Sequence, residues 1–336
     1  MAAPDGNFVY VANSMSDYIS ALPVAAAATA ARQIHVRGVI VFFDLLMSHD
    51  GKYLYADAAA TIDREQGDYL LMIRTSTMRI VHSAVIGVVR GLTLAPDGET
   101  IYEVGTGVTG NQVLYGFAAA NLRPERPVTV AGEAYYTDGL VITPNSKLVY
   151  VATTKWVKGN PVGGMPTAVL APTGKVLKRI GIGEGLHYLL ATPEGKAVYV
   201  GSESGIVAVS TASNTVIRHI AGPFTAGPMV LAPGGKTVYV GSGLNILPIS
   251  TTTNRAELPI QLPDDQVADR NLGSLAVSPD GTTLCVIVPF FPAQGTLFPI
   301  STATRTAGAP IMVGLDPERI VLSPNGKYGF VVDENS

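Results

Sequence analysis

The chain has 336 residues, of which 47% are hydrophobic and 15% charged, and its formal net charge is -3. These values supply enough apolar side chains for a packed core and argue against an intrinsically disordered chain. The 23 Lys and Arg residues are scattered along the chain, so we expect no nucleic-acid partner. The single cysteine, Cys285, rules out an intrachain disulfide and a cysteine-rich zinc site.

The chain carries no recognisable targeting or membrane segment. Its first residues have neither the basic region nor the apolar region of a signal peptide. No apolar run reaches the ~18 residues that a membrane span needs. We therefore expect no membrane span, and the residues themselves leave the localisation open.

A short turn motif recurs from one end of the chain to the other. A clear copy is Ser278-Pro279-Asp280-Gly281, in which Pro suits the first central turn position and Gly tolerates positive φ. The third position of the turn falls at residues 6, 51, 98, 146, 195, 235, 281 and 326, a mean spacing of about 46. A period of ~40–50 residues that contains only strand signals predicts the four-stranded blades of a β-propeller.

Each period divides into four predicted strands. We name them A to D, starting from the strand nearest the central channel of the propeller. Strand A is the apolar run before the turn, as at 275–277, and strand C alternates apolar and small residues, as at 206–209. A second turn, rich in Ser and Thr, separates strand C from strand D, as at 210–214. Strand B follows the first turn and usually carries a Tyr, and its copies run in chain order over 9–11, 54–56, 101–102, 149–151, 198–200 and 238–240.

The two ends of the chain do not match a whole number of blades. The chain begins at a strand B and ends after a strand B at 329–332, so it holds eight B strands and seven each of A, C and D. We expect an all-β, seven-bladed β-propeller in a single domain, 1–336, with the N- and C-terminal strands sharing one blade. The alternative is a ring with a partial eighth blade.

The repeat resembles a known propeller family. The pattern Ser-Pro-Asp-Gly-x-x-x-x-Val, a Ser-Thr-Ala-Thr turn and the segment 310–314 are similar to the YVTN or YncE-like repeat, and Val238-Tyr239-Val240-Gly241 stands where its name-giving tetrapeptide does. The resemblance covers essentially the whole chain. It places the chain near surface-layer proteins, lactonase-like propellers, a streptogramin-cleaving lyase and the haem d1 domain of nitrite reductases. Because such relatives are often exported, the resemblance favours an exported protein.

The variable loops are where a binding site is expected. The A–B and C–D turns share one regular face of a propeller, whereas the D–A and B–C connections share the opposite face and differ from blade to blade. Loops carried on a rigid frame often hold function. The residues that we single out there as ligand-binding are Arg90, Tyr135, Asp138, Lys155, Trp156 and Arg270, and Glu103 also falls among the variable positions.

The longest B–C insertion, 153–165, holds the only tryptophan, Trp156, between Lys155 and Lys158. An exposed indole could stack on a sugar or another ring-bearing ligand, with the lysines meeting an anion. The simpler interpretation is a loop that folds over its own Trp.

A second candidate set lies in a D–A loop. Glu184 and His187 are three residues apart there, and with Glu203 they could hold a divalent cation or act as an acid–base pair. A metal site needs three or more ligands, and the five histidines show no metal-binding spacing. The simpler interpretation is a group of solvated polar residues at the channel mouth.

No complete catalytic set accompanies the strong scaffold signals. We therefore predict a non-catalytic binding scaffold, a monomer without a resident cofactor, whose partner is a small molecule, a glycan or a protein. The alternative is a metal-assisted lactone hydrolase or lyase that uses Glu184, His187 and Glu203 around a divalent cation. A haem d1 carrier is a more distant option implied by the resemblance.

Overall fold

A computed structural model describes residues 3, 5, 8–12, 18–23, 32–62, 64–86, 89–107, 109–183, 185–221, 225–263, 272–290, 293–315 and 317–333. The chain forms two compact units. The first unit comprises 1–156 with 167–177, and the second comprises 157–166 with 178–336.

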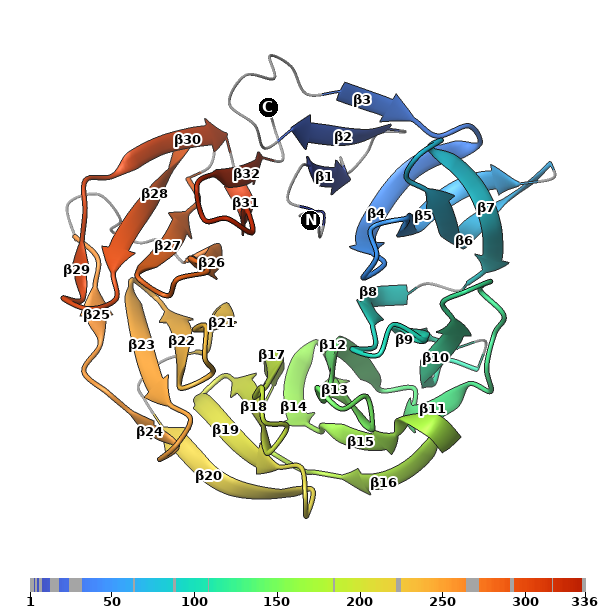
Figure 1. Ribbon diagram of the computed structural model, residues 1–336. Coiled ribbons are helices and arrows are strands. Elements are labelled where there is room, and N and C mark those ends of the chain that lie inside the picture. The colour runs from blue at the N-terminus through green and yellow to red at the C-terminus, as the bar shows by residue number, and fades with distance from the viewer. Residues whose placement is uncertain are drawn as a thin grey trace. The chain divides into compact units, whose positions relative to one another are not determined.

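The first unit consists of antiparallel sheets in which strands that follow one another in sequence are neighbours (Figure 1). The first two sheets are β1 (Phe8–Ala12), β2 (Tyr18–Pro23) and β3 (Arg32–His35), then β4 (Val39–Met47), β5 (Tyr53–Ile62), β6 (Glu65–Arg74) and β7 (Arg79–Val85). The third is β8 (Val89–Leu94), β9 (Thr100–Thr106), β10 (Gln112–Ala118) and β11 (Val128–Ala131). The fourth runs β12 (Tyr135–Ile142), β13 (Leu148–Val157), β15 (Thr167–Leu170) and, after the 3-10 turn η1 (Ala171–Thr173), β16 (Lys175–Arg179), whereas β14 (Asn160–Gly164) is counted with the second unit.

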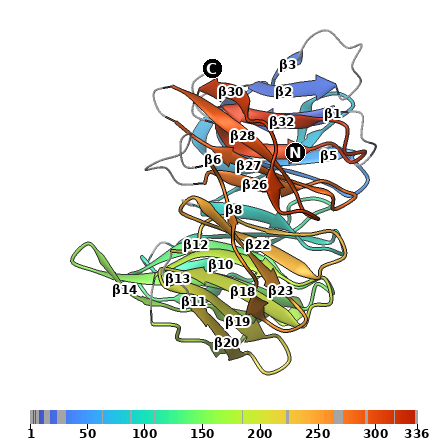
Figure 2. The same ribbon diagram turned by 90° about the vertical axis from the view of Figure 1, so that its left-hand side faces the viewer.

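The second unit continues the same pattern. Its first sheet is β17 (Leu186–Ala191), β18 (Ala197–Ser202), β19 (Gly205–Ser210) and β20 (Thr215–Ala221), of which β18 to β20 can be followed in Figure 2. The next is β21 (Met229–Leu231), β22 (Thr237–Ser242), β23 (Asn245–Ser250), β24 (Arg255–Ala256) and β25 (Ile260–Gln261). Then come β26 (Ser274–Val277), β27 (Thr283–Val288), β28 (Gln294–Ser301), β29 (Thr306–Ala307) and β30 (Ile311–Leu315), and finally the pair β31 (Pro317–Leu322) and β32 (Gly329–Asp333).

The strand inventory of the described residues agrees with the sequence. Six sheets contain all four strand types, the sheet of β1 to β3 supplies B, C and D, and the pair β31–β32 supplies A and B. In two sheets strand D is split into β24 and β25, or β29 and β30. Pro259 and Pro310 fall in these gaps, and proline cannot donate a backbone hydrogen bond to a neighbouring strand.

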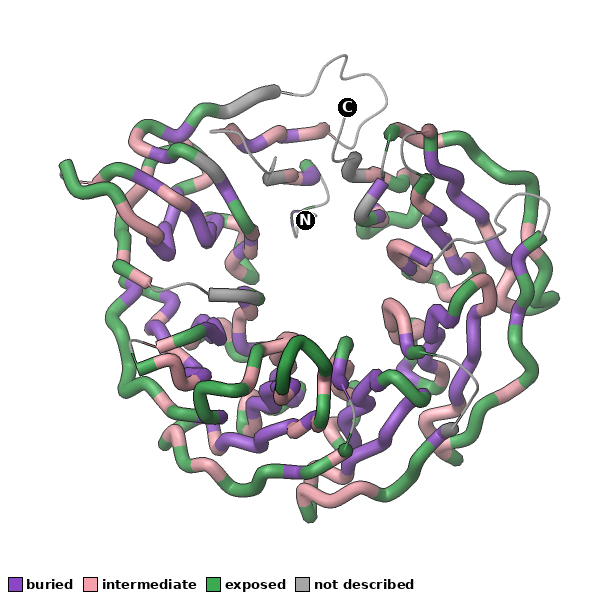
Figure 3. Tube along the Cα trace, turned by 180° about the vertical axis from the view of Figure 1, so that it is seen from behind, coloured by how far each residue is buried: buried purple, intermediate pink, exposed green. Residues whose placement is uncertain are grey.

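Burial explains why the B strands read as continuous apolar runs. Every residue of β18 is buried, including both faces of the strand, because the sheet is covered on each side. The outer strands are different, since most residues of β7 and β16 are exposed or half-buried. Figure 3 shows this gradient, with buried stretches in the middle strands of the sheets and exposed stretches in the outermost strands and loops.

Neighbouring sheets within a unit pack face to face through their B and C strands. In the first unit Tyr55, Leu70 and Met72 of one sheet share a buried cluster with Ile101 and Phe117 of the next. In the second unit an equivalent cluster joins the sheet of β21–β25 to that of β26–β30. The hydrophobic core is therefore a series of layers between sheets.

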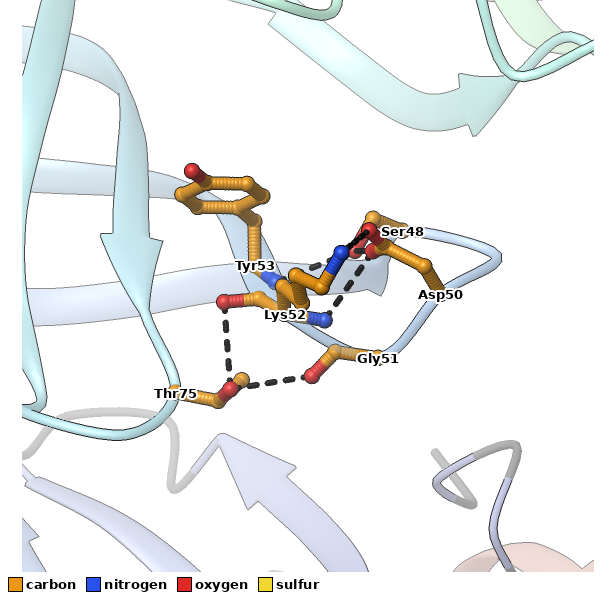
Figure 4. Close-up of polar contacts among 6 residues, drawn as sticks. All are labelled: Ser48, Asp50, Gly51, Lys52, Tyr53 and Thr75. Carbon is orange, nitrogen blue, oxygen red and sulfur yellow. Dashed lines mark hydrogen bonds and ion pairs between the residues drawn. The ribbon is translucent and has the colours of Figure 1, made fainter.

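The two repeated turns of each sheet bind one another. In Figure 4 the Asp50 carboxylate accepts hydrogen bonds from the Ser48 hydroxyl at 2.7 Å and the Lys52 backbone N–H at 3.1 Å, which together hold the pKa of Asp50 down at about 2. The hydroxyl of Thr75, in the C–D turn, donates to the carbonyl of Gly51 at 2.9 Å. The same contact recurs from Thr251 to Gly235 and from Thr302 to Gly281, each at 2.7 Å. The Ser/Thr turn thus repeats along the chain because its threonine hydroxyl donates a hydrogen bond to the Pro-Asp-Gly turn.

The strand-B tyrosines connect one sheet to the next. The Tyr55 hydroxyl donates to the carbonyl of Ala119 at 2.9 Å, and the Tyr102 hydroxyl reaches the carbonyl of Ala171 at 3.5 Å. In the second unit Tyr199 binds the Asn254 side chain in the same way. In each case the acceptor lies in the C–D turn of the following sheet.

One expected loop is a regular hairpin. The B–C insertion 153–165 is largely strand, because β13 continues to Val157 and β14 begins at Asn160. The connecting residues Lys158 and Gly159 have φ of 51° and 79°, as a tight hairpin turn with two positive-φ positions requires.

In the described part of the chain, no helix has the length and the apolar composition needed to cross a membrane.

Candidate functional site

The β12–β13 hairpin presents an exposed aromatic pair. Tyr136 and Trp156 are 61% and 39% exposed, and their rings meet edge to face with centroids 6.3 Å apart and an interplanar angle of 87°. The Trp156 backbone N–H donates to the carbonyl of Ala134 at 2.9 Å, which fixes this end of the hairpin. The indole is therefore partly open to solvent and has the Tyr136 ring beside it.

Strand alternation divides the predicted binding residues between the two faces of this hairpin. Tyr135 lies directly opposite Lys155, and Tyr136 lies opposite Thr154. Because successive side chains of a strand point to opposite faces, Trp156 and Tyr136 share one face, and Tyr135 and Lys155 share the other. Because the segment is a strand, Lys155 lies on the face of the hairpin opposite the indole.

Asp138 joins the aromatic face through a hydrogen bond. The Thr154 hydroxyl donates to Asp138 Oδ2 at 2.6 Å, and Thr154 is on the face that carries Tyr136. Asp138 is half-buried. The face that we call the aromatic hairpin face therefore consists of Tyr136, Asp138, Thr154 and Trp156.

Asp138 also belongs to a recurring irregularity of the A strands. In β4, β8, β12, β17 and β31 the pairing with strand B slips by one residue. The residues passed over are Ile40 and Phe43 in β4, and Gly91, Asp138, His187 and Glu318 in the other four strands; all except Ile40 lie seven or eight positions before the third residue of the following turn. A β-bulge re-aims a side chain and is common beside functional sites. Two of the predicted site residues, Asp138 and His187, therefore occupy equivalent places in their own sheets.

The structure describes His187 and Glu203, two of the three residues that the sequence suggested as a cation site or acid–base pair. His187 is exposed at the bulge of β17, and Glu203 is exposed in the turn between β18 and β19. The Glu203 backbone N–H donates to the carbonyl of Gly185 at 3.2 Å, so Glu203 lies against the segment that was predicted to carry the set. Glu184 itself lies outside the described residues.

Two further predicted contacts cannot be placed. The side chain of Arg90 lies outside what the structure describes, although its backbone pairs with Val104. Arg270 lies outside the described residues altogether. Among the residues that are described, no three of His, Cys, Asp and Glu gather in a way that could hold a metal ion.

A buried group of carboxyls in the first unit was not predicted. Glu103 is fully buried in the middle of β9 and not in a loop, and Asp57 in β5 is only 6% exposed. Asp44 lies directly opposite Asp57 on the neighbouring strand β4. The sequence did contain an indication that Glu103 is buried. Glu103 stands where other copies of strand B have the Val that follows Tyr, as at Val151.

Burial dominates the acidity of these carboxyls. Desolvation, followed by the charges of Asp57 and Asp44, raises the pKa of Glu103 to about 8. Desolvation, with Asp44 and Asp68 contributing, raises the pKa of Asp57 to about 7. Both groups therefore hold protons near neutral pH far more strongly than exposed carboxyls do.

The second unit has an open apolar hollow of about 680 Å³ beside its last strands. Its lining includes Leu297, Ile311, Ile320, Leu322 and Val331, from the sheet of β26–β30 and from the pair β31–β32. Cys285 also lines it, in β27 where other copies have Tyr, and burial raises the pKa of this thiol. The pair β31–β32 has no C or D strand to cover it within the described residues of this unit, which explains the hollow structurally.

Comparison with solved structures establishes the fold. No protein-family model matches the sequence, and no curated protein matches it either. The structure resembles hydrazine synthase of Kuenenia stuttgartiensis with a TM-score of 0.62 and 16% identity, over 99% of this chain and 91% of that chain. It also resembles the dihydro-heme d1 dehydrogenase NirN in complex with DHE, with a TM-score of 0.72 and 14% identity, over 96% of this chain and 67% of that one.

Both neighbours are β-propeller proteins, and at this level of identity the likeness concerns the fold alone. Together with the antiparallel four-stranded sheets, it confirms the predicted β-propeller character of the chain.

Proposed function

We propose that this chain is a non-catalytic binding scaffold of the YVTN/YncE-like propeller class and that its aromatic hairpin face binds a glycan. The observation that carries the proposal is the exposed edge-to-face pair of Tyr136 and Trp156. Exposed aromatic rings of this size on a rigid strand pair are costly to leave in water and are enriched at binding surfaces.

The chemistry of the face favours a neutral sugar over an anionic ligand. The apolar face of a pyranose ring can stack on the indole of Trp156, and its hydroxyls need acceptors nearby. Asp138 supplies a carboxylate acceptor on the same face, whereas Lys155 points away from it. Tyr135 and Lys155 would contact only a longer ligand that wraps the hairpin, and Arg90 and Arg270 are proposed as outer contacts.

The test is a glycan screen followed by titration with matched variants. We expect a binding glycan to shift the emission of Trp156, the only tryptophan of the chain. Tyr136→Ala should weaken binding by about tenfold or more, as loss of a central aromatic contact does. Tyr188→Ala, which removes an exposed tyrosine of the second unit, is the control and should bind normally.

The proposal fails if the screen leaves the Trp156 emission unchanged, or if Tyr136→Ala and Trp156→Ala bind every partner as tightly as the parent protein does. Calorimetry replaces fluorescence for the Trp156→Ala variant, because that variant has lost the reporter.

The purified protein used in the glycan screen also tests two alternative functions, a lactone hydrolase or lyase and a tetrapyrrole-binding protein. A lactone hydrolase or lyase that uses Glu184, His187 and Glu203 requires a bound divalent cation and a response of activity to chelator. The NirN neighbour is in complex with DHE, so a tetrapyrrole-binding role would show in the visible absorbance of the purified protein.

The blade count belongs to the same proposal. Seven blades follow if the strands β1–β3 and β31–β32 contribute to one mixed blade, which leaves one strand B in excess. We propose such a seven-bladed monomer in a single domain. An experimental density map that resolved eight separate blades, or light scattering that gave a dimer mass, would contradict it.

A further inference from the structure

A row of three side chains crosses the sheet of β4–β7 near its C–D turn. Cross-strand pairing places Tyr53 of β5 opposite Arg74 of β6, and Arg74 opposite Arg79 of β7. Directly paired residues point to the same face of a sheet, with their Cβ atoms about 4.5–5.5 Å apart. Both arginines are exposed, and like charges placed opposite each other destabilise a strand pair. The stability of the hairpin therefore does not explain the two arginines.

This arginine pair departs from the pattern of the repeated C–D turn. The segment 74–79 forms the same six-residue turn as 210–215, 250–255 and 301–306, with a threonine at the second position in all four. The fifth residue has positive φ in every one of them, between 50° and 59°. The first position is a serine in the other three turns and Arg74 in this one. Binding residues concentrate on loops held by a rigid scaffold, so a departure confined to one turn favours a binding role.

An aromatic ring holds Arg74 in place. The guanidinium carbon of Arg74 lies 5.5 Å from the centroid of the Tyr53 ring, within the range of a cation–π contact. The adjacent turn is fixed as well, because the Thr75 hydroxyl donates to the carbonyls of Gly51 and Lys52 at 2.9 and 3.1 Å (Figure 4). A ligand that binds a guanidinium already held in this way removes less side-chain entropy than one that binds a free arginine.

Neither arginine has an acidic partner among the residues that the structure describes. The Arg79 side chain makes no hydrogen bond or ion pair there, and Arg74 makes only its aromatic contact. Asp50, in the neighbouring A–B turn, is bound to Lys52 Nζ at 3.0 Å. The nearest acidic residue of β6 is Asp68, six positions before Arg74 and therefore about 20 Å away along the strand. The two positive charges are thus available to a ligand.

A threonine hydroxyl lies beside the arginine pair. In an equivalent turn the fourth and sixth side chains touch, since the hydroxyl oxygens of Ser213 and Thr215 are 2.7 Å apart. The same two positions are Thr77 and Arg79 in this turn. The Thr77 hydroxyl is exposed and has no hydrogen-bond partner in the described part of the chain, because the sixth side chain is here an arginine. The turn therefore offers a hydroxyl next to two guanidinium groups.

We propose that this arginine pair is an anion-binding site and that its ligand is a phosphate monoester. An arginine fork donates two parallel hydrogen bonds to a phosphate or a carboxylate, so two forks need more than the two oxygens of a carboxylate. A phosphate monoester has three free oxygens and a charge of about −1.5 to −2 at pH 7, which matches two arginines. One of these oxygens can also accept a hydrogen bond from Thr77. The bound phosphate replaces the repulsion between Arg74 and Arg79 by charge-assisted contacts with both.

The test measures the binding of inorganic phosphate to the full chain by calorimetry and by thermal unfolding, with chloride as the reference salt at constant ionic strength. We expect one phosphate per chain and an unfolding temperature that rises with phosphate concentration, as binding to the folded state requires. Arg74→Gln and Arg79→Gln should each weaken binding by about tenfold or more, because each removes hydrogen bonds between charged groups. Arg79→Lys keeps the charge but loses the fork, so it should also weaken binding.

A control variant and four further probes identify the site and the group. Arg255→Gln removes the arginine that occupies the place of Arg79 in a turn of the second unit, where Ser250 stands opposite it, and should bind phosphate like the parent chain. The affinity for acetate should be lower than that for phosphate by about tenfold or more, since acetate has one charge and two oxygens. Phosphate binding should weaken below pH ~6, where the second proton returns, whereas sulfate binding should not change. Glucose 6-phosphate and a phosphoserine peptide carry the same group on a sugar and on a protein, and the tighter of the two identifies its source.

Any of three results overturns the proposal. The first is an effect of phosphate no larger than that of chloride at the same ionic strength, which would leave the pair as solvated surface charges. The second is phosphate binding that is unchanged in Arg74→Gln and Arg79→Gln, or that is lost equally in Arg255→Gln. The third is acetate binding as tight as phosphate binding. None of these results bears on the glycan proposal, since the two sites share no residue.

Discussion

Removal of one hydroxyl, by Tyr55→Phe, tests whether the strand-B tyrosines fasten neighbouring sheets. Tyr55 is buried, and its hydroxyl donates to the buried carbonyl of Ala119 at 2.9 Å. The change removes a net hydrogen bond worth about 1 kcal/mol and leaves a buried acceptor unpaired, so the expected loss of unfolding free energy is about 1–2 kcal/mol. Tyr102→Phe should cost less, below about 0.5 kcal/mol, because its hydroxyl lies 3.5 Å from its acceptor.

Urea unfolding followed by the emission of Trp156 measures these costs, because Trp156 and Tyr55 belong to the same unit. The matched control is Tyr53→Phe, two residues earlier in the chain. Tyr53 is half-buried, and the structure gives its hydroxyl no hydrogen-bond partner among the described residues, so its removal should leave the midpoint unchanged. Equal shifts in Tyr55→Phe and Tyr53→Phe, or a larger shift in Tyr102→Phe than in Tyr55→Phe, would refute the reasoning.

Three further changes test other contacts. Thr302→Val removes the 2.7 Å hydrogen bond to the carbonyl of Gly281 and should lower the unfolding free energy by about 1 kcal/mol. Gly295→Ala would place its Cβ 2.2 Å from the Pro317 ring, and this overpacking should cost about 1–3 kcal/mol in a thermal unfolding measurement. Burial raises the pKa of Glu103 from 4.5 to about 8, so its stabilising contribution is full below pH 4.5 and is lost as the pH rises through about 8. Glu103→Gln should therefore remove a fall of about 1.4 kcal/mol per pH unit within that window.

Each of these changes has a control elsewhere in the chain. Thr252→Val alters an exposed threonine of an equivalent turn and should be neutral, so equal losses would show that the hydrogen bond of Thr302 is not the cause. The Cβ added by Gly132→Ala has no atom within 4 Å. A loss of stability as large as that of Gly295→Ala would argue against steric conflict as the cause. A wild-type pH profile parallel to that of Glu103→Gln, with Glu133→Gln as reference, would show that burial does not control the titration of Glu103.

The repeat made the fold predictable from the sequence. The spacing of the Pro-Asp-Gly turns and the apolar runs between them specified four-stranded sheets and the excess strand B, and the strands of the described residues follow that order. Such information is local, because a turn residue and a strand residue each act through their own backbone preferences. The pairing of the two repeated turns through Thr75 and Gly51 explains why both motifs recur together.

The sites were predictable only in part, for a reason that lies in strand geometry. The sequence singled out the segment around Trp156 and Asp138 but treated it as a loop. Once it is a hairpin, alternation of side chains decides that Asp138 lies with the indole and that Lys155 does not. A shift of one residue in register would reverse that outcome.

The buried carboxyls show what tertiary structure alone decides. The sequence contains Asp57 and Glu103, which are 46 positions apart, and composition gives no reason to relate them. Strand register turns each of them toward the same layer, and the packing of one sheet on the next removes water from that layer. The sequence therefore determined the repeated scaffold through local turn and strand preferences. Only the tertiary structure brought distant acidic groups together in a place where their charges matter.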